Sequence, residues 1–197
     1  MDFYGHPSSN YFIMKKTILT YGIIAGLISS SLFIGLMLLG RGADHDFENG
    51  MIYGYTLMIL AFVFIFVATK ITRDKHMGGN ITFGKAFLIG LYISFIASTV
   101  YVLVWFIDLY AFNPDFVAKY AAHTIETMKA AGASASEIAA SKAQMDKLAE
   151  MYKNPLFVAL LTYAEILPVG LLVSVISALV LRKKNKDGSM AVPVAAH

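Results

Sequence analysis

Four long apolar runs, separated by polar segments, dominate the sequence. They cover residues 17–39, 51–69, 86–107 and 156–181, and Glu165 is the one charged residue inside any of them. Each run reaches the roughly 17 to 25 residues that a helix needs to cross the hydrocarbon core of a bilayer. A bilayer accepts only helices or closed barrels, and these runs are too long for barrel strands of about 10 residues. The pattern predicts an all-α, polytopic membrane protein with a four-helix transmembrane bundle over residues 17–181.

The composition agrees with this class. Hydrophobic residues make up 57% of the chain and charged residues 15%, whereas soluble domains carry roughly 25% charged residues. We therefore expect membrane lipid as a partner. The net charge of +3 does not support nucleic-acid binding, because an excess of cytoplasmic Lys and Arg is usual in polytopic proteins. This sequence has no cysteine, so it contains no disulfide or thiolate chemistry.

The distribution of basic residues predicts the orientation, because short loops rich in Lys and Arg stay in the cytoplasm. One side of the predicted bundle carries Lys15, Lys16, Lys70, Arg73, Lys75, Lys85, Arg182, Lys183, Lys184 and Lys186. The other side has fewer basic residues and most of the acidic ones. We expect a multi-pass protein of the bacterial inner membrane with both termini in the cytoplasm. An aromatic belt at the outer boundary would contain Tyr53, Tyr55, Trp105, Tyr110 and Tyr152.

The two ends of the chain are polar. We expect residues 1–16 to form a loosely ordered cytoplasmic extension and residues 182–197 a basic, then flexible, cytoplasmic tail. Met14, Lys15 and Lys16 before an apolar run also resemble a bacterial export signal. We favour a retained anchor, because the run exceeds the about 7 to 15 residues of a signal peptide and no cleavage site of the A-x-A type follows.

Small residues at four-residue spacing mark the faces through which membrane helices pack closely. Three predicted spans have such a face: Gly22, Gly26 and Ser30; Ala86, Gly90, Ser94 and Ser98; Gly170, Ser174 and Ala178. We favour packing within the chain, and a homo-oligomer is the alternative.

The long polar segment between the third and fourth spans predicts an external helical hairpin over residues 113–153. Asn113 and Pro114 are typical of a helix start, and Gly132 of a helix end. Ser134 and Glu137 form a capping-box pattern that opens a second helix. Each arm has an apolar face, formed by Val117, Tyr120, Ala121, Thr124 and Met128 in the first and by Ile138, Met145, Leu148 and Tyr152 in the second. We favour packing of these faces on each other and on the membrane surface over docking of a partner protein.

Glu165 is the main candidate for chemistry, because a carboxylate inside a membrane needs a partner or a proton. We expect it at the depth of a polar layer with Ser98, Thr99 and Tyr101, and of residues 29–31. Pro168 lacks an amide hydrogen and predicts a kink nearby. A neutral acid bonded across helices is the favoured interpretation, and a proton or cation site in a transporter is the alternative. Asp108 should lie at the aqueous interface.

Other acidic residues give weaker signals. Residues 41–50 contain three carboxylates and a histidine, but they miss the EF-hand spacing, so we expect a solvated loop and no metal site. No phosphate loop, zinc-binding HExxH or nucleophile elbow occurs in the sequence. We therefore predict no enzymatic activity, no catalytic residues and no cofactor.

Three stretches carry a family resemblance: residues 81–87 (ITFGKAF), residues 154–156 (NPL), and residues 165–171 (EILPVGL) continuing to the basic residues 182–184. Through them the chain resembles the bacterial membrane proteins grouped as domain of unknown function 4199, from about Lys15 to Lys184. The resemblance implies a small polytopic inner-membrane protein of unassigned activity, and it implies no site residues.

The sequence leaves two hypotheses for the function. The leading one is a non-enzymatic accessory or assembly subunit that presents the external hairpin to a partner protein. The alternative is a small transporter or channel, either a single chain or an oligomer, that uses Glu165 as a proton or cation site.

Overall fold

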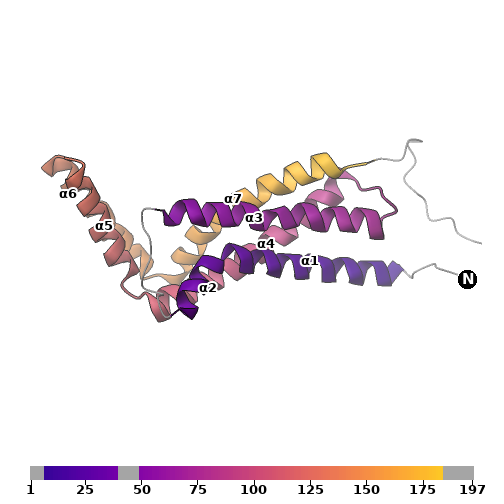
Figure 1. Ribbon diagram of the computed structural model, residues 1–197, viewed down its shortest axis with the longest axis horizontal. Coiled ribbons are helices and arrows are strands. Elements are labelled where there is room, and N and C mark those ends of the chain that lie inside the picture. Colours follow the sequence, from indigo (N-terminus) through magenta and orange to yellow (C-terminus); the bar gives the residue numbers. More distant parts are fainter. Residues whose placement is uncertain (1–6, 40–48, 184–197) are drawn as a thin grey trace, which may run out of the picture.

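The computed structural model describes residues 7–39 and 49–183, and this part of the chain is helical throughout, without a β-strand. In chain order (Figure 1), the elements are α1 (Pro7–Ser29), α2 (Ser31–Leu38), α3 (Gly50–Ile71), the π-helical turn η1 (Thr72–His76), α4 (Phe83–Ile107), a second π-helical turn η2 (Asp108–Phe112), α5 (Phe116–Ala130), α6 (Ala135–Tyr152) and α7 (Pro155–Leu181). The all-helical class is the one that the sequence predicts. Residues 1–6, the acidic segment 40–48 and the tail 184–197 lie outside the described residues.

Three helical stretches within the described residues are long and apolar enough to cross a membrane. They are Ile52–His76, Phe83–Phe112 and Pro155–Leu181; they contain the third and fourth predicted spans and all but the first residue of the second. The first predicted span differs from expectation, because its helix begins at Pro7 and is divided at Ser30. Residues 7–16 are therefore helical and not a loose extension. Proline suits the first position of a helix, since it has no amide hydrogen to leave unbonded there.

The junction between α1 and α2 keeps helical hydrogen bonds. The carbonyl oxygen of Gly26 accepts from the hydroxyls of Ser29 and Ser30, at 3.0 and 2.8 Å, and from the backbone amide of Ser30 at 3.1 Å. Serine side chains that bond back to a carbonyl one turn earlier often bend helices. α2 continues directly after α1 as a separate short helix.

Helices α4 and α7 run antiparallel and approach closely through small residues. Gly90 faces Ser174, and Gly170 faces Ser94; a Cβ atom on either glycine would lie 2.7 Å from the Cβ atom of the serine opposite. The two serine hydroxyls are 3.2 Å apart and form a hydrogen bond between the helices. The small residues expected on the third and fourth spans thus lie against each other within one chain.

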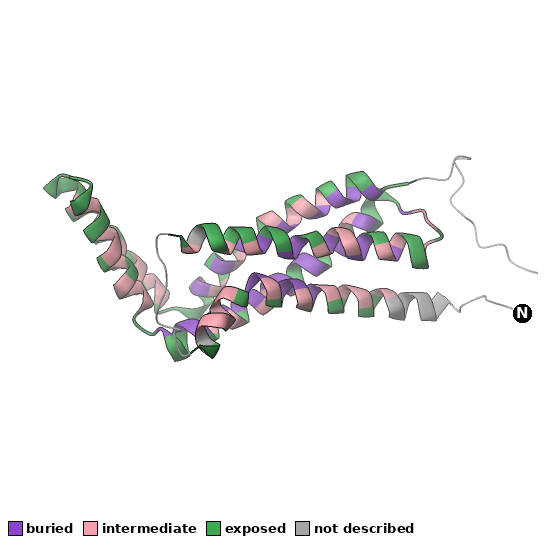
Figure 2. Cartoon of the chain, in the orientation of Figure 1, coloured by how far each residue is buried: buried purple, intermediate pink, exposed green. Residues whose placement is uncertain are grey.

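Helices α1 and α4 run parallel. A Cβ atom on Gly22 would lie 2.7 Å from the Cβ atom of Ile96, and one on Gly26 would lie 2.5 Å from that of Val100. The two contacts are four residues apart on each helix and follow the same order along the chain, so α1 and α4 run in the same direction. With α3 packed against α1 and α7, the four helices enclose an apolar core (Figure 2) that includes Phe62.

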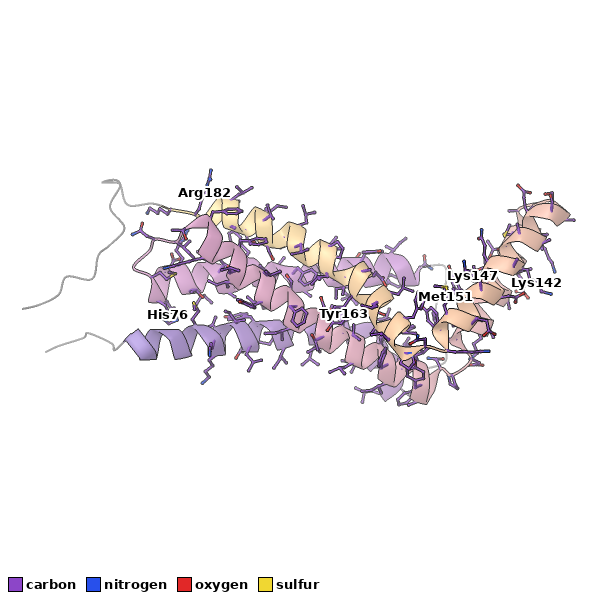
Figure 3. The ribbon with its side chains drawn as sticks, turned by 180° about the vertical axis from the view of Figure 1, so that it is seen from behind. His76, Lys142, Lys147, Met151, Tyr163 and Arg182 are labelled. Atoms are coloured by element: carbon purple, nitrogen blue, oxygen red, sulfur yellow. The ribbon has the colours of Figure 1, made fainter. Side chains whose placement is uncertain are left out.

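One end of the bundle is basic. The backbones of Ile81 and Lys183 exchange two hydrogen bonds, of 3.2 and 3.0 Å, which join the α3–α4 connection to the end of α7. The guanidinium of Arg73 also donates to the carbonyl oxygen of Leu181 at 3.3 Å. Figure 3 shows His76 and Arg182 at this end, opposite to Lys142 and Lys147 on α6.

Helices α5 and α6 form a hairpin that extends away from the bundle (Figure 1). Gly132 provides the turn with a φ of +76°, a left-handed conformation that favours glycine. The capping box of Ser134 and Glu137 is present, with both of its hydrogen bonds. The Ser134 hydroxyl and amide hold the pKa of the Glu137 carboxyl below its usual value. No residue of α5 or α6 is buried (Figure 2).

The start of the hairpin differs from the prediction. Asn113 does not cap a helix beginning at Pro114; instead, its backbone amide donates to the carbonyl oxygen of Asp108 at 2.8 Å, and α5 begins at Phe116. Asp108 is fully buried, contrary to the expected aqueous position, and both of its carboxylate oxygens accept from the side-chain amide nitrogen of Asn113 at 3.2 Å. The π-helical turn η2 turns both side chains inward, which the helical periodicity of the sequence does not reveal.

Candidate functional site

A cavity of about 330 Å³ lies where the bundle meets the base of the hairpin, at the end opposite to the basic residues. Five parts of the chain contribute to its wall: the α1–α2 junction, the start of α3, the end of α4, the first half of α7 and the hairpin. Its aromatic lining residues are Phe33, Tyr53, Tyr55, Tyr101, Trp105, Phe116, Tyr120 and Tyr152. Among the described lining residues, Glu165 is the one that carries a charge.

The start of α7 positions Glu165. The side-chain oxygen of Asn154 accepts from the backbone amide of Leu156 at 3.0 Å, and Pro155 occupies the first turn. This cap fixes the helix start, so Glu165, ten residues further on, lies about 15 Å along the axis at 1.5 Å per residue. Its neighbours Thr162 and Ile166 are buried in the bundle, whereas the Glu165 side chain is exposed at the cavity wall.

The Glu165 carboxylate has no hydrogen bond or ion pair with any other residue that the structure describes. The bond across helices expected for a structural acid is thus missing from this part of the chain. The polar contacts between α4 and α7 are made elsewhere, by the hydroxyls of Ser94 and Ser174 and, at 2.7 Å, by those of Thr99 and Tyr163.

The aromatic wall is ordered by ring contacts. The ring centroid of Phe33 lies 5.3 Å from that of Trp105 and 5.8 Å from that of Tyr101. Trp105 in turn meets Phe116 edge to face at 4.9 Å. Such contacts fix ring orientations, because aromatic pairs prefer tilted or edge-to-face geometry. α2, α4 and α5 therefore form one continuous aromatic surface.

Tyr152 closes the cavity from the end of α6. Tyr152 is half-buried, and this partial desolvation raises the pKa of its phenol; the negative charge of Glu165 and the nearby Tyr120 raise that pKa further. The Tyr152 phenol is therefore protonated at neutral pH and keeps a hydrogen to donate. The hairpin thus contributes an O–H group to the cavity that Glu165 also lines.

The chain matches the family model described as "Protein of unknown function (DUF4199)" over residues 20–183. This match covers most of the sequence. The chain belongs to the DUF4199 family. The chain has no match among the curated proteins and none among the solved structures.

The predicted polar layer of this DUF4199 member is only partly assembled. Tyr101 lines the cavity with Glu165, as does Ser29. Ser98 is buried and donates to the carbonyl oxygen of Ser94, while Thr99 bonds to Phe95 and Tyr163 on another side of α4. Pro168 lies within α7, which continues through it, and is not part of the cavity wall.

The sequence predicts another role for several lining residues. Tyr53, Tyr55, Trp105 and Tyr152 are expected in an interfacial belt, and all four line the cavity. Their common level at one end of the predicted bundle is visible in the sequence. Which of these side chains point into the cavity depends on how each helix is rotated about its own axis. The sequence does not reveal that rotation, because the predicted spans are apolar on all faces.

Proposed function

We propose that the chain is a four-span protein of the bacterial inner membrane, with α1 and α2 together as the first span. α1 supports this assignment because it packs along α4, which is long and apolar enough to cross a membrane. Its outward face is also apolar: Leu19 is 53% exposed, Ile23 39% and Leu27 47%. A stripe of this kind at helical spacing favours contact with lipid, because soluble surfaces seldom expose continuous apolar patches.

The basic end of the bundle supports cytoplasmic termini. Both described chain ends and the α3–α4 connection, with Arg73 and Lys75, lie at this end, and positively charged loops stay inside. In this orientation the α5–α6 hairpin and the mouth of the cavity face the exterior.

For this membrane protein we propose binding of a cation at Glu165, as a step of transport or conduction. The observation that carries the proposal is a carboxylate at membrane depth that faces a cavity and has no partner among the described residues. Intramembrane carboxylates that face cavities commonly mark ion or substrate pathways. The proposal assigns no chemical reaction to the site.

Charge displacement in proteoliposomes tests this proposal. The protein is reconstituted, and Na⁺, K⁺, H⁺, ammonium and choline are each applied by rapid solution exchange on a supported membrane. We expect at least one cation to give a saturable signal. Glu165→Gln should weaken that cation's apparent affinity by at least about tenfold, or about 1.4 kcal/mol, since a neutral amide no longer balances the charge of the cation.

Glu150→Gln is the matched control, because Glu150 is an exposed hairpin acid paired with Lys153 at 2.7 Å. It should behave as the unmodified chain does. If none of the applied cations gives a signal that depends on Glu165, the proposal is wrong.

A second candidate function, an accessory subunit that presents the hairpin to a partner, has support from one observation. Two helices of 15 and 18 residues project from the bundle without a buried residue. Isolated helices of about this length are marginally stable in water, so contact with another surface would stabilise them.

A further inference from the structure

The cavity combines rings on most sides with one negative charge. Eight of its sixteen described lining residues are aromatic, and Glu165 is the one ionisable acid or base other than the tyrosines. The face of an aromatic ring carries partial negative charge and attracts cations within about 6 Å, most strongly when water is displaced. The aromatic rings and the Glu165 carboxylate therefore both favour a positively charged ligand.

Other classes of ligand fit the wall less well. Ca²⁺ takes about six to eight oxygen ligands, and Mg²⁺ is held in octahedral geometry by carboxylates together with water or phosphate oxygens. The described residues contain no group of three or more His, Cys, Asp or Glu side chains suited to a metal ion. An anion would face Glu165, and no basic side chain lies among the described lining residues.

A cation with a weakly hydrated, apolar surface matches both the aromatic rings and the carboxylate of the wall. The volume of about 330 Å³ lies at the lower end of the roughly 300–1,000 Å³ usual for ligand pockets, so it suits a small molecule. Alkylated ammonium groups spread their charge over methyl or methylene groups, which pack on rings without a large loss of hydration.

We propose that this cavity binds a small organic ammonium ion, whose alkyl groups pack on Tyr101 and Trp105 and whose charge is balanced by Glu165. The proposal rests on the cation site proposed above and names its substrate class. The phenol of Tyr152, which lines the same cavity, donates to a polar group on the ligand.

The chain carries its own reporter for this proposal. Trp105 is the only tryptophan in the sequence and lines the cavity, so its fluorescence reports on the occupant. The full-length protein in a sugar-based detergent is titrated with choline. The comparison ligands are 3,3-dimethylbutan-1-ol, which has the same shape with carbon in place of nitrogen, and K⁺.

We expect a saturable change with choline and binding at least about tenfold weaker for the neutral alcohol and for K⁺, because only choline combines charge with an apolar surface. Glu165→Gln should weaken choline binding at least about tenfold, and Glu150→Gln should leave it unchanged. Tyr101→Phe keeps the ring and should preserve binding, whereas Tyr101→Leu should weaken it about threefold or more.

Thermal unfolding of each variant separates loss of binding from loss of fold. Equal binding of choline and the neutral alcohol would overturn the proposal, as would choline binding that is indifferent to both Glu165→Gln and Tyr101→Leu in folded protein. If only inorganic cations give charge displacement that depends on Glu165, the ammonium proposal fails and the cation site stands. If no cation does, both fail.

The ammonium group has two candidate sources, a soluble amine and a lipid headgroup. Choline titrations in nanodiscs of phosphatidylcholine and of phosphatidylglycerol distinguish them. A lipid headgroup in the cavity would compete with choline and raise its apparent Kd in phosphatidylcholine alone. An equal Kd in both lipids identifies the soluble amine.

Discussion

At the scale of single residues, two glycines determine how closely α1 can approach α4. A Cβ atom on Gly26 would lie 2.5 Å from the Cβ atom of Val100 and 2.9 Å from the carbonyl oxygen of Ala97. Neither atom belongs to the flexible end of a side chain, so the helices themselves would have to separate. Gly35, further along the same predicted span, offers a direct comparison, because a Cβ atom there would meet no other atom within 4 Å.

Gly26→Ala should therefore lower the free energy of unfolding by about 1–3 kcal/mol, the usual cost of overpacking a close contact. Gly35→Ala should leave stability unchanged or raise it slightly, because alanine favours helix more than glycine does. Reversible unfolding in mixed detergent micelles measures both variants. Equal stability of the two would mean that α1 does not pack on α4 as described.

The sequence was informative about these contacts and uninformative about the surroundings of Glu165. Four-residue spacing of small side chains marks a packing face directly, and Gly90, Ser94, Gly170 and Ser174 lie at such a contact. The cavity, in contrast, depends on the rotation of helices whose faces are almost equally apolar. Depth along the helix correctly placed Tyr101 beside Glu165 in the wall of the cavity. The same depth also suggested Ser98 and Thr99, whose hydroxyls bond to other residues and do not line the cavity.

At the scale of elements, local capping signals were reliable where they act within one turn. Ser134 and Glu137 begin α6 as their spacing predicts, and Asn154 caps α7. Asn113 was misassigned because its partner, Asp108, lies in a π-helical turn with a different residue count per turn. A motif predicts a helix start only when no neighbouring element offers its side chain another partner.

The hairpin gives the element-scale prediction. Replacing residues 122–147 by a short glycine linker removes the outer part of α5 and α6 and retains Phe116, Tyr120 and Tyr152 at the cavity. If the hairpin presents a surface to a partner, the intact chain purified in mild detergent should carry a stoichiometric second chain in native mass spectra, and the shortened chain should lack it. A homogeneous species for the intact chain would count against the accessory-subunit hypothesis.

At the scale of the whole molecule, the pattern of apolar runs was sufficient to predict the three helical stretches that are long and apolar enough to cross a membrane. The helix over the first apolar run was harder to predict, because α1 begins ten residues before that run and ends at Ser29. The charge distribution predicts an orientation, and the structure brings the basic connection and the end of α7 together at one end of the bundle.

Cysteine labelling tests the orientation, since the sequence has no cysteine of its own. Ser136→Cys, on the hairpin, should react with a membrane-impermeant maleimide in intact cells. Lys75→Cys, at the basic end, should react only after the membrane is permeabilised. Protection of Ser136→Cys together with labelling of Lys75→Cys would reverse the proposed topology.

The hairpin also has a mechanical consequence. Its base, with Phe116, Tyr120 and Tyr152, is one wall of the cavity, and its other end is free of the bundle. The 18 residues of α6 span about 27 Å at 1.5 Å per residue. A tilt of about 10° at the base would therefore move the tip by about 5 Å. If the hairpin tilts as a rigid body, a change in the width of the cavity at its base displaces its tip further than it displaces the cavity wall.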